Sequence, residues 1–162
     1  MPRDGEPSAP ITPQNCYDAE PIPEAARAEI ERLLASGDLF RYTSDNAPVA
    51  LLEAEFAAFM GTRYAVCVAS CSAALFLALK ALDLPRGARV LVPAFTFAAV
   101  PSAIVHADCV PVLVEVGANF RIDMDDFAAK FDDSIGAVMI SHMRGHTSDM
   151  DAIMELANAR GV

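Results

Sequence analysis

The sequence predicts an α/β protein with a mostly parallel sheet covered by helices. Short apolar runs alternate with segments that keep the 3.6-residue period of a helix. The runs are apolar throughout rather than alternately apolar and polar, which is typical of strands buried on both faces. Glycine and proline residues separate the segments, as they do at turns. Together these observations favour repeated strand–helix units and a parallel sheet.

Two helices precede the alternating pattern. The first is predicted over residues 23–35, because Pro23 suits a first helical turn and Gly37 lies just past the end. The second begins at Pro48, and its apolar positions keep a helical period. Gly61 occupies the usual position after a last turn, so the second helix should end there.

The strand–helix alternation follows. The predicted strands span residues 64–69, 89–93, 110–116 and 137–141. The predicted helices span residues 73–82, 98–106, 124–131 and 149–160. Ser148 and Asp151 fit a capping box at the start of the last helix. Because ligands gather at the carboxyl ends of parallel strands, residues 70–72, 95–97 and 142–146 should share one edge of the sheet.

Composition and charge limit the function classes. The 162 residues suffice for one domain with a core, and 54% of them are hydrophobic, with a mean hydropathy of +0.31. No segment reaches the roughly 20 apolar residues of a membrane helix. The net charge is −10, so the chain lacks the excess of lysine and arginine that is typical of a nucleic-acid-binding protein. We therefore expect no membrane or nucleic-acid partner, and a cytoplasmic location as the default.

The two ends of the chain carry separate expectations. Residues 1–15 are rich in proline and polar residues and lack the apolar stretch of a secretion signal. We expect a disordered tail over residues 1–20. Gly161 suits the end of a helix and Val162 the beginning of another strand, so the sequence predicts a truncated repeat. On this interpretation residues 21–162 form an incomplete domain.

The four cysteines predict neither disulfides nor a metal centre. They lie in apolar runs or in the predicted tail, which is typical of a reducing compartment. Cys67 and Cys71 lack the spacing and the further ligands of a zinc or iron–sulfur site, so we predict no metal ligands. Cys71 at a helix start is either a reactive thiol or, as we favour, a small residue that lets the backbone approach a ligand.

Residues 70–74, Ser-Cys-Ser-Ala-Ala, form the most informative stretch. They join an apolar run to a helical pattern, and the first N–H groups of a helix lack partners within the helix. Those groups and the positive end of the helix dipole make an anion site, most often for phosphate. Ser70 and Ser72 either donate to a bound phosphate or only cap the helix.

Three ordered segments of the chain resemble the N-terminal part of the DegT/StrS-type aminotransferases, which are pyridoxal-phosphate enzymes. The segments are VALLEAEFAAFMGTRYAVCVASCSAALFLALKAL, ARVLVPAFTFAAVPSAIVHADCVPVLVEV and AVMISHMRGHTSDMDAIMELANARGV. The resemblance covers most of the chain from about Leu39 onward. It implies part of the large domain of a fold-type I pyridoxal-phosphate transferase. It also implies a homodimer that acts on a nucleotide-linked keto sugar and an amino donor.

The resemblance also implies cofactor-binding residues. The family usually has Ser-Gly-Thr-Ala-Ala where this chain has residues 70–74, and its Gly-Thr pair binds the cofactor phosphate, so Cys71 and Ser72 inherit that role. Phe97 matches the aromatic residue that stacks on the pyridine ring, and ordinary core packing is its alternative role. Arg144 and His146 depart from the family's His-Leu-Tyr-Gly-Gln motif. Arg144 either meets an anionic substrate group or lies exposed beside Asp149.

Transamination needs a lysine that holds the cofactor as a Schiff base and a carboxylate at the pyridine nitrogen. In the family both lie further along the chain. Lys80 and Lys130 are the only lysines here, and neither fits the family's lysine motif. We therefore predict no catalytic residue in this chain and no transamination by the chain alone.

The preferred interpretation is thus an N-terminal fragment of a pyridoxal-phosphate-dependent sugar aminotransferase. Three alternatives remain open. They are a non-catalytic phosphate-binding or interaction remnant of the fold, a fragment of a pyridoxal-phosphate-dependent sugar dehydratase, and a doubly wound domain for another phosphate ligand. The absence of a glycine-rich dinucleotide turn weighs against the last.

Overall fold

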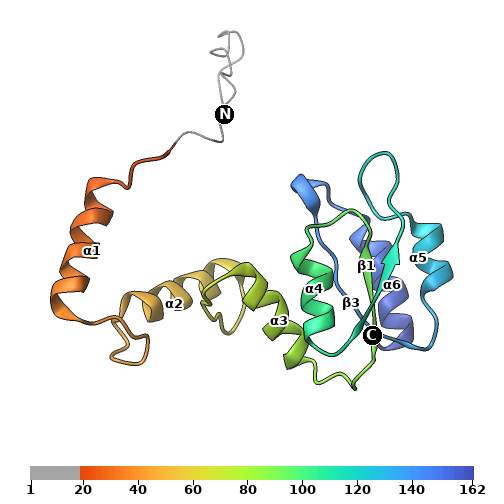
Figure 1. Ribbon diagram of the computed structural model, residues 1–162, viewed down its shortest axis with the longest axis horizontal. Coiled ribbons are helices and arrows are strands. Elements are labelled where there is room, and N and C mark those ends of the chain that lie inside the picture. Colours follow the sequence, from red (N-terminus) through yellow and green to blue (C-terminus); the bar gives the residue numbers. More distant parts are fainter. Residues whose placement is uncertain (1–18) are drawn as a thin grey trace, which may run out of the picture. The chain divides into compact units, whose positions relative to one another are not determined.

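The computed structural model describes residues 19–162 (Figure 1). Most of the expected disordered tail, residues 1–20, lies outside the described residues. The chain divides into two compact units, Met1–Val66 and Cys67–Val162. Every strand formed by residues 19–162 belongs to the second unit.

The described part of the first unit consists of two helices, α1 (Glu24–Ser36) and α2 (Pro48–Met60). Both lie within one residue of the predicted bounds. Gly37 and Gly61 end them in the left-handed conformation, with φ of 73° and 67°, which glycine adopts without a steric cost. No helix formed by residues 19–162 combines the length and apolarity needed to cross a membrane.

The second unit is a three-stranded parallel sheet with helices on both faces. Its helices are α3 (Cys71–Ala81), α4 (Ala99–His106), α5 (Met124–Lys130) and α6 (Met150–Arg160). Its strands are β1 (Arg89–Pro93), β2 (Val110–Val114) and β3 (Ile135–Val138), in the order β2-β1-β3. Leu91 in the centre of β1 lies opposite Val112 of β2 and Val138 of β3. The predicted fold class, a parallel sheet covered by helices, is confirmed.

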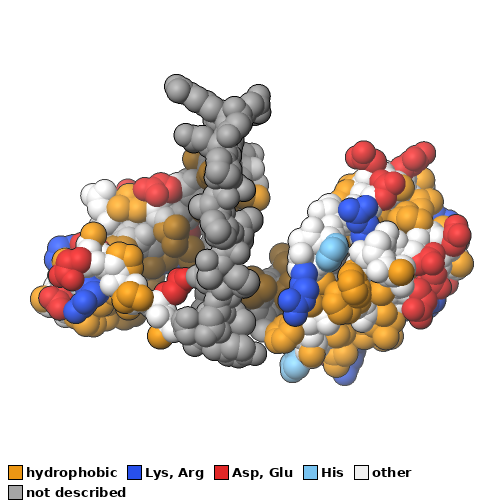
Figure 2. All heavy atoms as spheres, turned by 90° about the horizontal axis from the view of Figure 1, so that it is seen from above, with side chains coloured by type: hydrophobic (Ala, Val, Ile, Leu, Met, Phe, Trp, Pro, Cys, Tyr) orange, Lys and Arg blue, Asp and Glu red, His pale blue; other side chains and the backbone are white. Residues whose placement is uncertain are grey.

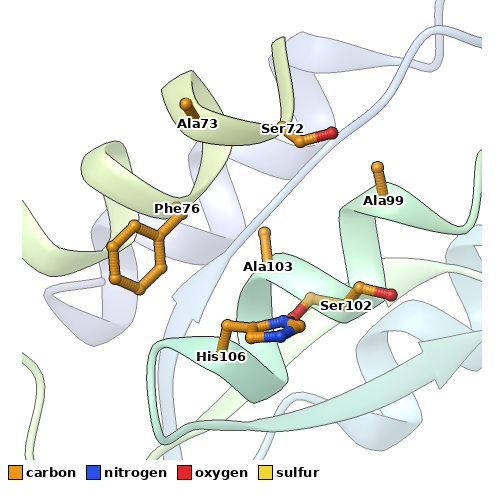
Figure 3. Close-up of a pocket in the computed structure, with 7 residues that line it drawn as sticks. All are labelled: Ser72, Ala73, Phe76, Ala99, Ser102, Ala103 and His106. Carbon is orange, nitrogen blue, oxygen red and sulfur yellow. Dashed lines mark hydrogen bonds between the residues drawn. The ribbon is translucent and has the colours of Figure 1, made fainter. Parts of the chain in front are cut away.

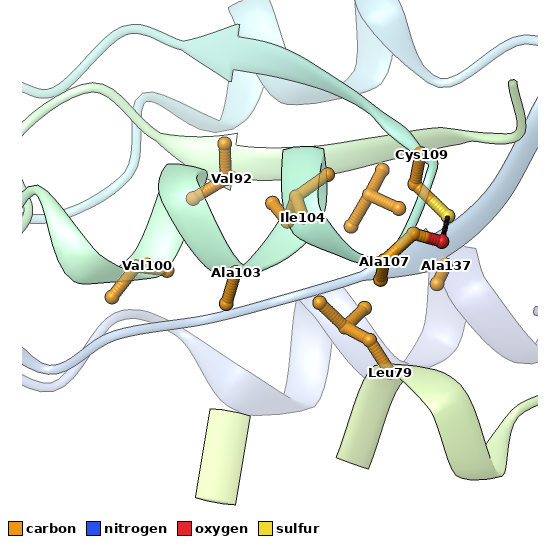
Figure 4. Close-up of a cluster of buried hydrophobic side chains, with 9 residues drawn as sticks. Leu79, Val92, Val100, Ala103, Ile104, Ala107, Cys109 and Ala137 are labelled. Carbon is orange, nitrogen blue, oxygen red and sulfur yellow. Dashed lines mark hydrogen bonds between the residues drawn. The ribbon is translucent and has the colours of Figure 1, made fainter. Parts of the chain in front are cut away.

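Strand β1 separates two hydrophobic clusters because successive side chains of a strand point to opposite faces. Val90 and Val92 pack with residues of α3 and α4, as Figure 4 shows for Val92, Ile104 and Leu79. Leu91 packs on the other face with Phe127 of α5 and with residues of α6. Helix α4 therefore covers one face of the sheet, and α5 and α6 cover the other (Figure 1).

Burial on both faces is confirmed for β1 and wrong for β2. Residues 90–93 of β1 are fully buried, whereas Val110 and Leu113 of β2 are 47% and 51% exposed. Strand β2 is at the edge of the sheet and has only β1 as a neighbour among the described residues. An edge strand lacks the cover that a central strand receives, although its sequence is equally apolar.

The predicted strand over residues 64–69 is wrong. These residues are irregular, and Tyr64 and Val66 are 73% and 68% exposed. A strand requires a neighbouring strand for its N–H and C=O groups, and this segment pairs with none of β1, β2 or β3. The apolar pattern identified a segment with strand propensity but not a pairing partner.

The predicted capping box at Ser148 and Asp151 is also wrong. Asp149 is the N-cap of α6, and its Oδ1 accepts a hydrogen bond from the Ala152 N–H at 3.1 Å. Ser148 is buried and its Oγ accepts instead from the Ile122 N–H at 3.1 Å. Ser148 therefore stabilises the contact between α6 and the loop after β2.

Asp126 joins α5 to the end of β2. Its Oδ2 accepts from Lys130 Nζ at 2.7 Å and from the Glu115 N–H at 2.7 Å. These two hydrogen bonds hold the pKa of Asp126 below its ordinary value, and the bond from Lys130 has the larger effect. In the unfolded chain an aspartate has a pKa of about 3.9. At pH values above this, ionised Asp126 stabilises the folded state. This stabilisation is lost as the pH falls through the lower pKa that Asp126 has in the folded state.

We therefore expect the urea midpoint of unfolding to fall on acidification from pH 5 to below pH 4, and to fall less in Asp126→Asn. Unfolding would be followed by circular dichroism at each pH. Asp133→Asn is the matched control, since Asp133 is exposed and makes no hydrogen bond or ion pair with residues 19–162. An unchanged pH dependence in Asp126→Asn would show that Asp126 does not carry this effect.

Candidate functional site

The first turn of α3 has the predicted cap and also two free donors. Ser70 is extended, with φ −161° and ψ 158°, and its Oγ accepts from the Ala73 N–H at 3.1 Å. The Ala74 N–H donates to the Ser70 carbonyl. The N–H groups of Cys71 and Ser72 make no hydrogen bond with any residue from 19 to 162. Capping and anion binding are therefore compatible in this turn, and we call it the α3 cup.

Cys71 is accommodated in the α3 cup without backbone strain. It is the first residue of α3 and is not among the described residues with positive φ. A side chain at this position therefore has no conformational cost, although the resembling motif has glycine there. Its thiol is free and exposed. The cysteine keeps the backbone donor that an anion would use.

A cavity of about 510 Å³ extends from the α3 cup between α3 and α4 (Figure 3). It is lined by Ser72, Ala73 and Phe76 of α3 and by Ala99, Ser102, Ala103 and His106 of α4. Ser72 and Ala99 lie at one end, where each belongs to the first turn of its helix. The cavity thus brings Ser72 beside the start of α4. Residues 70–72 do not follow a strand of the sheet, so their predicted place at the shared sheet edge is not confirmed.

Phe97 lies in the segment between β1 and α4, two residues before Ala99. Its side chain is 67% exposed. Core packing, the alternative role for Phe97, is therefore wrong, because a core aromatic side chain would be buried. The ring does not line the cavity between α3 and α4. It remains available to a ligand on the same side of the sheet as the strand ends.

Residues 142–146 form a loop, as Gly145 predicted. The loop contains a short 3₁₀ turn, η1 (Met143–Gly145), and Gly145 has φ 78°. His142 and His146 therefore do not share a helical face. No group of three or more His, Cys, Asp or Glu side chains that could hold a metal ion occurs in the described part of the chain.

Arg144 has a left-handed backbone, with φ 52° and ψ 28°, which is uncommon for a residue other than glycine. Its side chain is exposed and makes no ion pair with residues 19–162. Arg144 is thus exposed, as its alternative interpretation beside Asp149 expected, and it forms no ion pair with Asp149, whose Oδ1 caps α6.

An aromatic row connects the ends of β1 and β3 through the loop after β2. The ring centroids of Phe95 and Phe120 are 4.9 Å apart, and those of Phe120 and His146 are 5.6 Å apart. Thr96 Oγ1 and Ser141 Oγ form a hydrogen bond of 2.6 Å. The predicted convergence of residues 95–97 and 142–146 is thus confirmed. Sequence reasoning missed Phe120, whose loop position gave no periodic signal.

The sequence comparisons identify one family. The profile of the DegT/DnrJ/EryC1/StrS aminotransferase family matches residues 22–162. The chain is 37% identical over 135 residues to the spore coat polysaccharide biosynthesis protein SpsC of Bacillus subtilis, covering 83% of this chain and 34% of that protein. It is also 37% identical to a UDP-N-acetyl-3-dehydro-alpha-D-glucosamine 3-aminotransferase of Acidithiobacillus ferrooxidans, covering 68% and 30% of the two chains. The chain spans about a third of the length of these relatives.

Solved structures agree with this assignment. An aminotransferase from Psychrobacter cryohalolentis superposes with a TM-score of 0.80 at 29% identity, over 88% of this chain and 36% of that one. The pyridoxal-phosphate form of a putative sugar aminotransferase from Streptococcus pneumoniae has a TM-score of 0.77 at 28% identity, over 86% and 35%. An Escherichia coli GDP-4-keto-6-deoxy-D-mannose-3-dehydratase, at 23% identity and a TM-score of 0.78 over 89% and 38%, shows the fold alone.

Proposed function

The chain belongs to the DegT/DnrJ/EryC1/StrS aminotransferase family, and we propose that its second unit holds the phosphate and one ring face of pyridoxal 5'-phosphate in a sugar aminotransferase. The whole enzyme would be a homodimer that transfers an amino group from a donor to a nucleotide-linked keto sugar. Two relatives support this class of reaction, since one is named for an amino transfer to a UDP-linked dehydro sugar and another for polysaccharide biosynthesis.

The observation that carries the proposal is the pair of unpartnered N–H groups in the α3 cup. Cys71 and Ser72 present these donors at the positive end of an eleven-residue helix. Ser72 adds a hydroxyl beside its own N–H, so three donors are available to one phosphate. Ser70 stays bonded to the Ala73 N–H, which fixes the turn before a ligand arrives. This donor set fits a phosphate dianion.

Phe97 would cover one face of the cofactor ring. Its exposed side chain follows β1 at the carboxyl end of the sheet, where parallel sheets bind ligands. Stacking would orient the ring and exclude water from that face. The bound cofactor would supply the electron sink for amino transfer.

We propose no covalent role in the α3 cup for either lysine of the chain. Lys80 lies in the last turn of α3, at the opposite end of the helix from Cys71. Lys130 Nζ donates to Asp126 at 2.7 Å and to the Leu113 carbonyl at 2.9 Å. We therefore assign neither residue to covalent attachment or proton transfer, and propose that the chain alone does not complete the reaction.

Titration of the full 162-residue chain with pyridoxal phosphate and with pyridoxal tests the α3 cup. We expect calorimetry to show that pyridoxal phosphate binds at least 10-fold more tightly than pyridoxal. Each hydrogen bond from the cup to the charged phosphate should contribute about 1.5–3 kcal/mol. Inorganic phosphate should compete. Equal affinities for the two compounds would contradict the proposal and favour a remnant without a phosphate site.

Borohydride treatment followed by peptide mass spectrometry tests the assignment of the lysines. We expect no stoichiometric label on Lys80 or Lys130. A stoichiometric label on either residue would contradict our view that the chain lacks a cofactor lysine. The cup and the ring face would serve a dehydratase of this fold equally well, so the amino-transfer part of the proposal depends on the family and its named relatives.

A further inference from the structure

We propose that a cavity in the first unit binds a small organic cation, a primary alkylammonium, through the carboxylate of Asp38. The cavity has a volume of about 200 Å³ and is formed by the last turn of α1, the loop that follows it and the first turn of α2. We call it the Asp38 cavity. The inference goes beyond the proposed function, because the α3 cup belongs to the second unit.

The wall of the Asp38 cavity combines one charged side chain with apolar surroundings. Apart from Asp38, the lining residues are all apolar: Leu33, Leu39, Phe40, Ala47, Pro48 and Val49. Sites for drug-sized ligands have volumes of about 300–1,000 Å³. The Asp38 cavity is smaller, at about 200 Å³, so it suits a ligand of few atoms that carries one polar group on a short apolar chain.

The carboxylate of Asp38 has a buried oxygen without a hydrogen-bond donor. Its Oδ1 is out of reach of solvent, and no group in residues 19–162 donates to it. No other buried side-chain oxygen or nitrogen in the described part of the chain lacks a partner in this way. A buried acceptor without a donor costs free energy, and a charged acceptor costs more. A ligand with a positive charge and an N–H group would remove this cost.

The arginines of the described part of the first unit have other partners. Arg27, Arg32 and Arg41 pair with Glu24, Glu29 and Glu53, and Arg63 lies over the ring of Tyr64. Figure 2 shows acidic and basic side chains next to each other at the left of the view, in the part of the chain that contains α1.

Arg32 attracts Asp38 but supplies no hydrogen bond to its buried oxygen. The hydrogen bond with Glu29 raises the pKa of Arg32 most, and the charge of Asp38 adds a smaller effect in the same direction. Arg32 Nε and Nη2 donate to Glu29 at 2.9 and 2.6 Å. The donor for Asp38 Oδ1 therefore has to come from a ligand.

Phe40 is a second feature of the cavity that favours a cation. It lines the cavity, and its ring stacks on that of Tyr42 with centroids 5.4 Å apart and planes at 19°. The face of an aromatic ring attracts an organic cation. Leu33 and Val49 would contact the alkyl chain of the ligand. A primary ammonium fits better than a quaternary one, because only an N–H group can donate to Asp38 Oδ1.

Calorimetric titration of the full 162-residue chain with n-butylamine tests the site. At pH 7 this amine is protonated, since an alkylammonium such as that of lysine has a pKa of about 10.4. Pyridoxal phosphate is left out because its aldehyde condenses with amines. The ionic strength is kept constant because a chain with net charge −10 attracts any cation. We expect n-butylammonium to bind at least 10-fold more tightly than n-butanol or tetramethylammonium.

Asp38→Asn keeps the size of the side chain and removes its charge. We expect it to weaken n-butylammonium binding at least 10-fold. Without ligand its urea midpoint should equal or exceed that of the wild type, because a buried charge without a donor is removed. Asp45→Asn is the matched control, since Asp45 is exposed in the same loop and does not line the cavity. n-Butylammonium should raise the urea midpoint of the wild type and of Asp45→Asn, but not that of Asp38→Asn.

The comparison of probes on the wild type needs no variant to fold. Equal affinities for n-butylammonium and n-butanol would overturn the assignment of a cation, and tight binding of tetramethylammonium would overturn the contact through an N–H group. Absence of saturable n-butylamine binding, or binding that Asp38→Asn leaves unchanged, would overturn the site itself. Asp38→Asn should bind pyridoxal phosphate as the wild type does in a separate titration, so a failure of the α3 cup would be recognised independently.

Discussion

Ser72→Asp should abolish binding of pyridoxal phosphate while leaving the fold intact. Ser72 is exposed in the first turn of α3, beside an N–H group that has no acceptor among the described residues. An aspartate carboxylate there would accept from the free donors and repel the phosphate dianion. We expect calorimetric affinity to fall by at least 100-fold, and the loss should be partly reversed at high ionic strength.

The substitution has a built-in control for folding. A carboxylate in the first turn interacts favourably with the helix dipole, by about 0.3–1 kcal/mol, so the urea midpoint should stay equal or rise. Ser102→Ala provides a matched serine variant from the same cavity, on α4 rather than α3, and should bind as wild type does. Wild-type affinity in Ser72→Asp would show that the phosphate is not held at the α3 cup.

Phe127→Ala should lower the free energy of unfolding of the second unit by about 3–5 kcal/mol. Phe127 is fully buried in the cluster that contains Leu91 and Ile153. Its ring also meets that of Phe131 edge-on, with centroids 5.3 Å apart. Truncation would remove both the apolar burial and this ring contact and leave a cavity between α5 and the sheet.

Urea unfolding monitored by circular dichroism would measure the change. Phe127→Leu, which keeps most of the apolar volume, should cost less than the alanine variant. Val105→Ala on α4 is the surface control, because Val105 is 58% exposed, and should change stability by less than about 0.5 kcal/mol. A cost for Phe127→Ala as small as that of the control would contradict the packing described for this cluster.

Helix bounds could be predicted well because their signals are local. Pro48 and Gly61 mark the ends of α2 by the conformations that their own backbones adopt, whatever surrounds them. The strands depend on partners, and this explains the main errors. Residues 64–69 and Val110–Val114 are both apolar, yet only the second segment pairs with β1. Pairing is a property of distant segments and leaves no mark in the pattern of one segment.

In the candidate site, too, features with local signals could be predicted and features that depend on distant contacts could not. The α3 cup could be predicted, because a helix start leaves free donors in any protein and because the ordered motifs indicated a cofactor. Phe120 could not, since its importance comes from ring contacts with residues that lie 25 and 26 positions away, Phe95 and His146. The conformation of Arg144 was equally hidden, because the sequence gives no sign that an arginine rather than glycine takes a positive φ.

The position of β1 between the two hydrophobic clusters also bears on how this chain can diverge. Val92 and Leu91 are neighbours in sequence, but each belongs to a different cluster. Substitutions that change side-chain volume in β1 can therefore disturb the packing of both clusters. Substitutions in α4 or α5 disturb only one cluster, because each of these helices contacts one. Substitutions in these helices can accumulate independently of each other. Strand β1 should consequently be the slowest-evolving element of the unit, constrained by packing rather than by contact with any ligand.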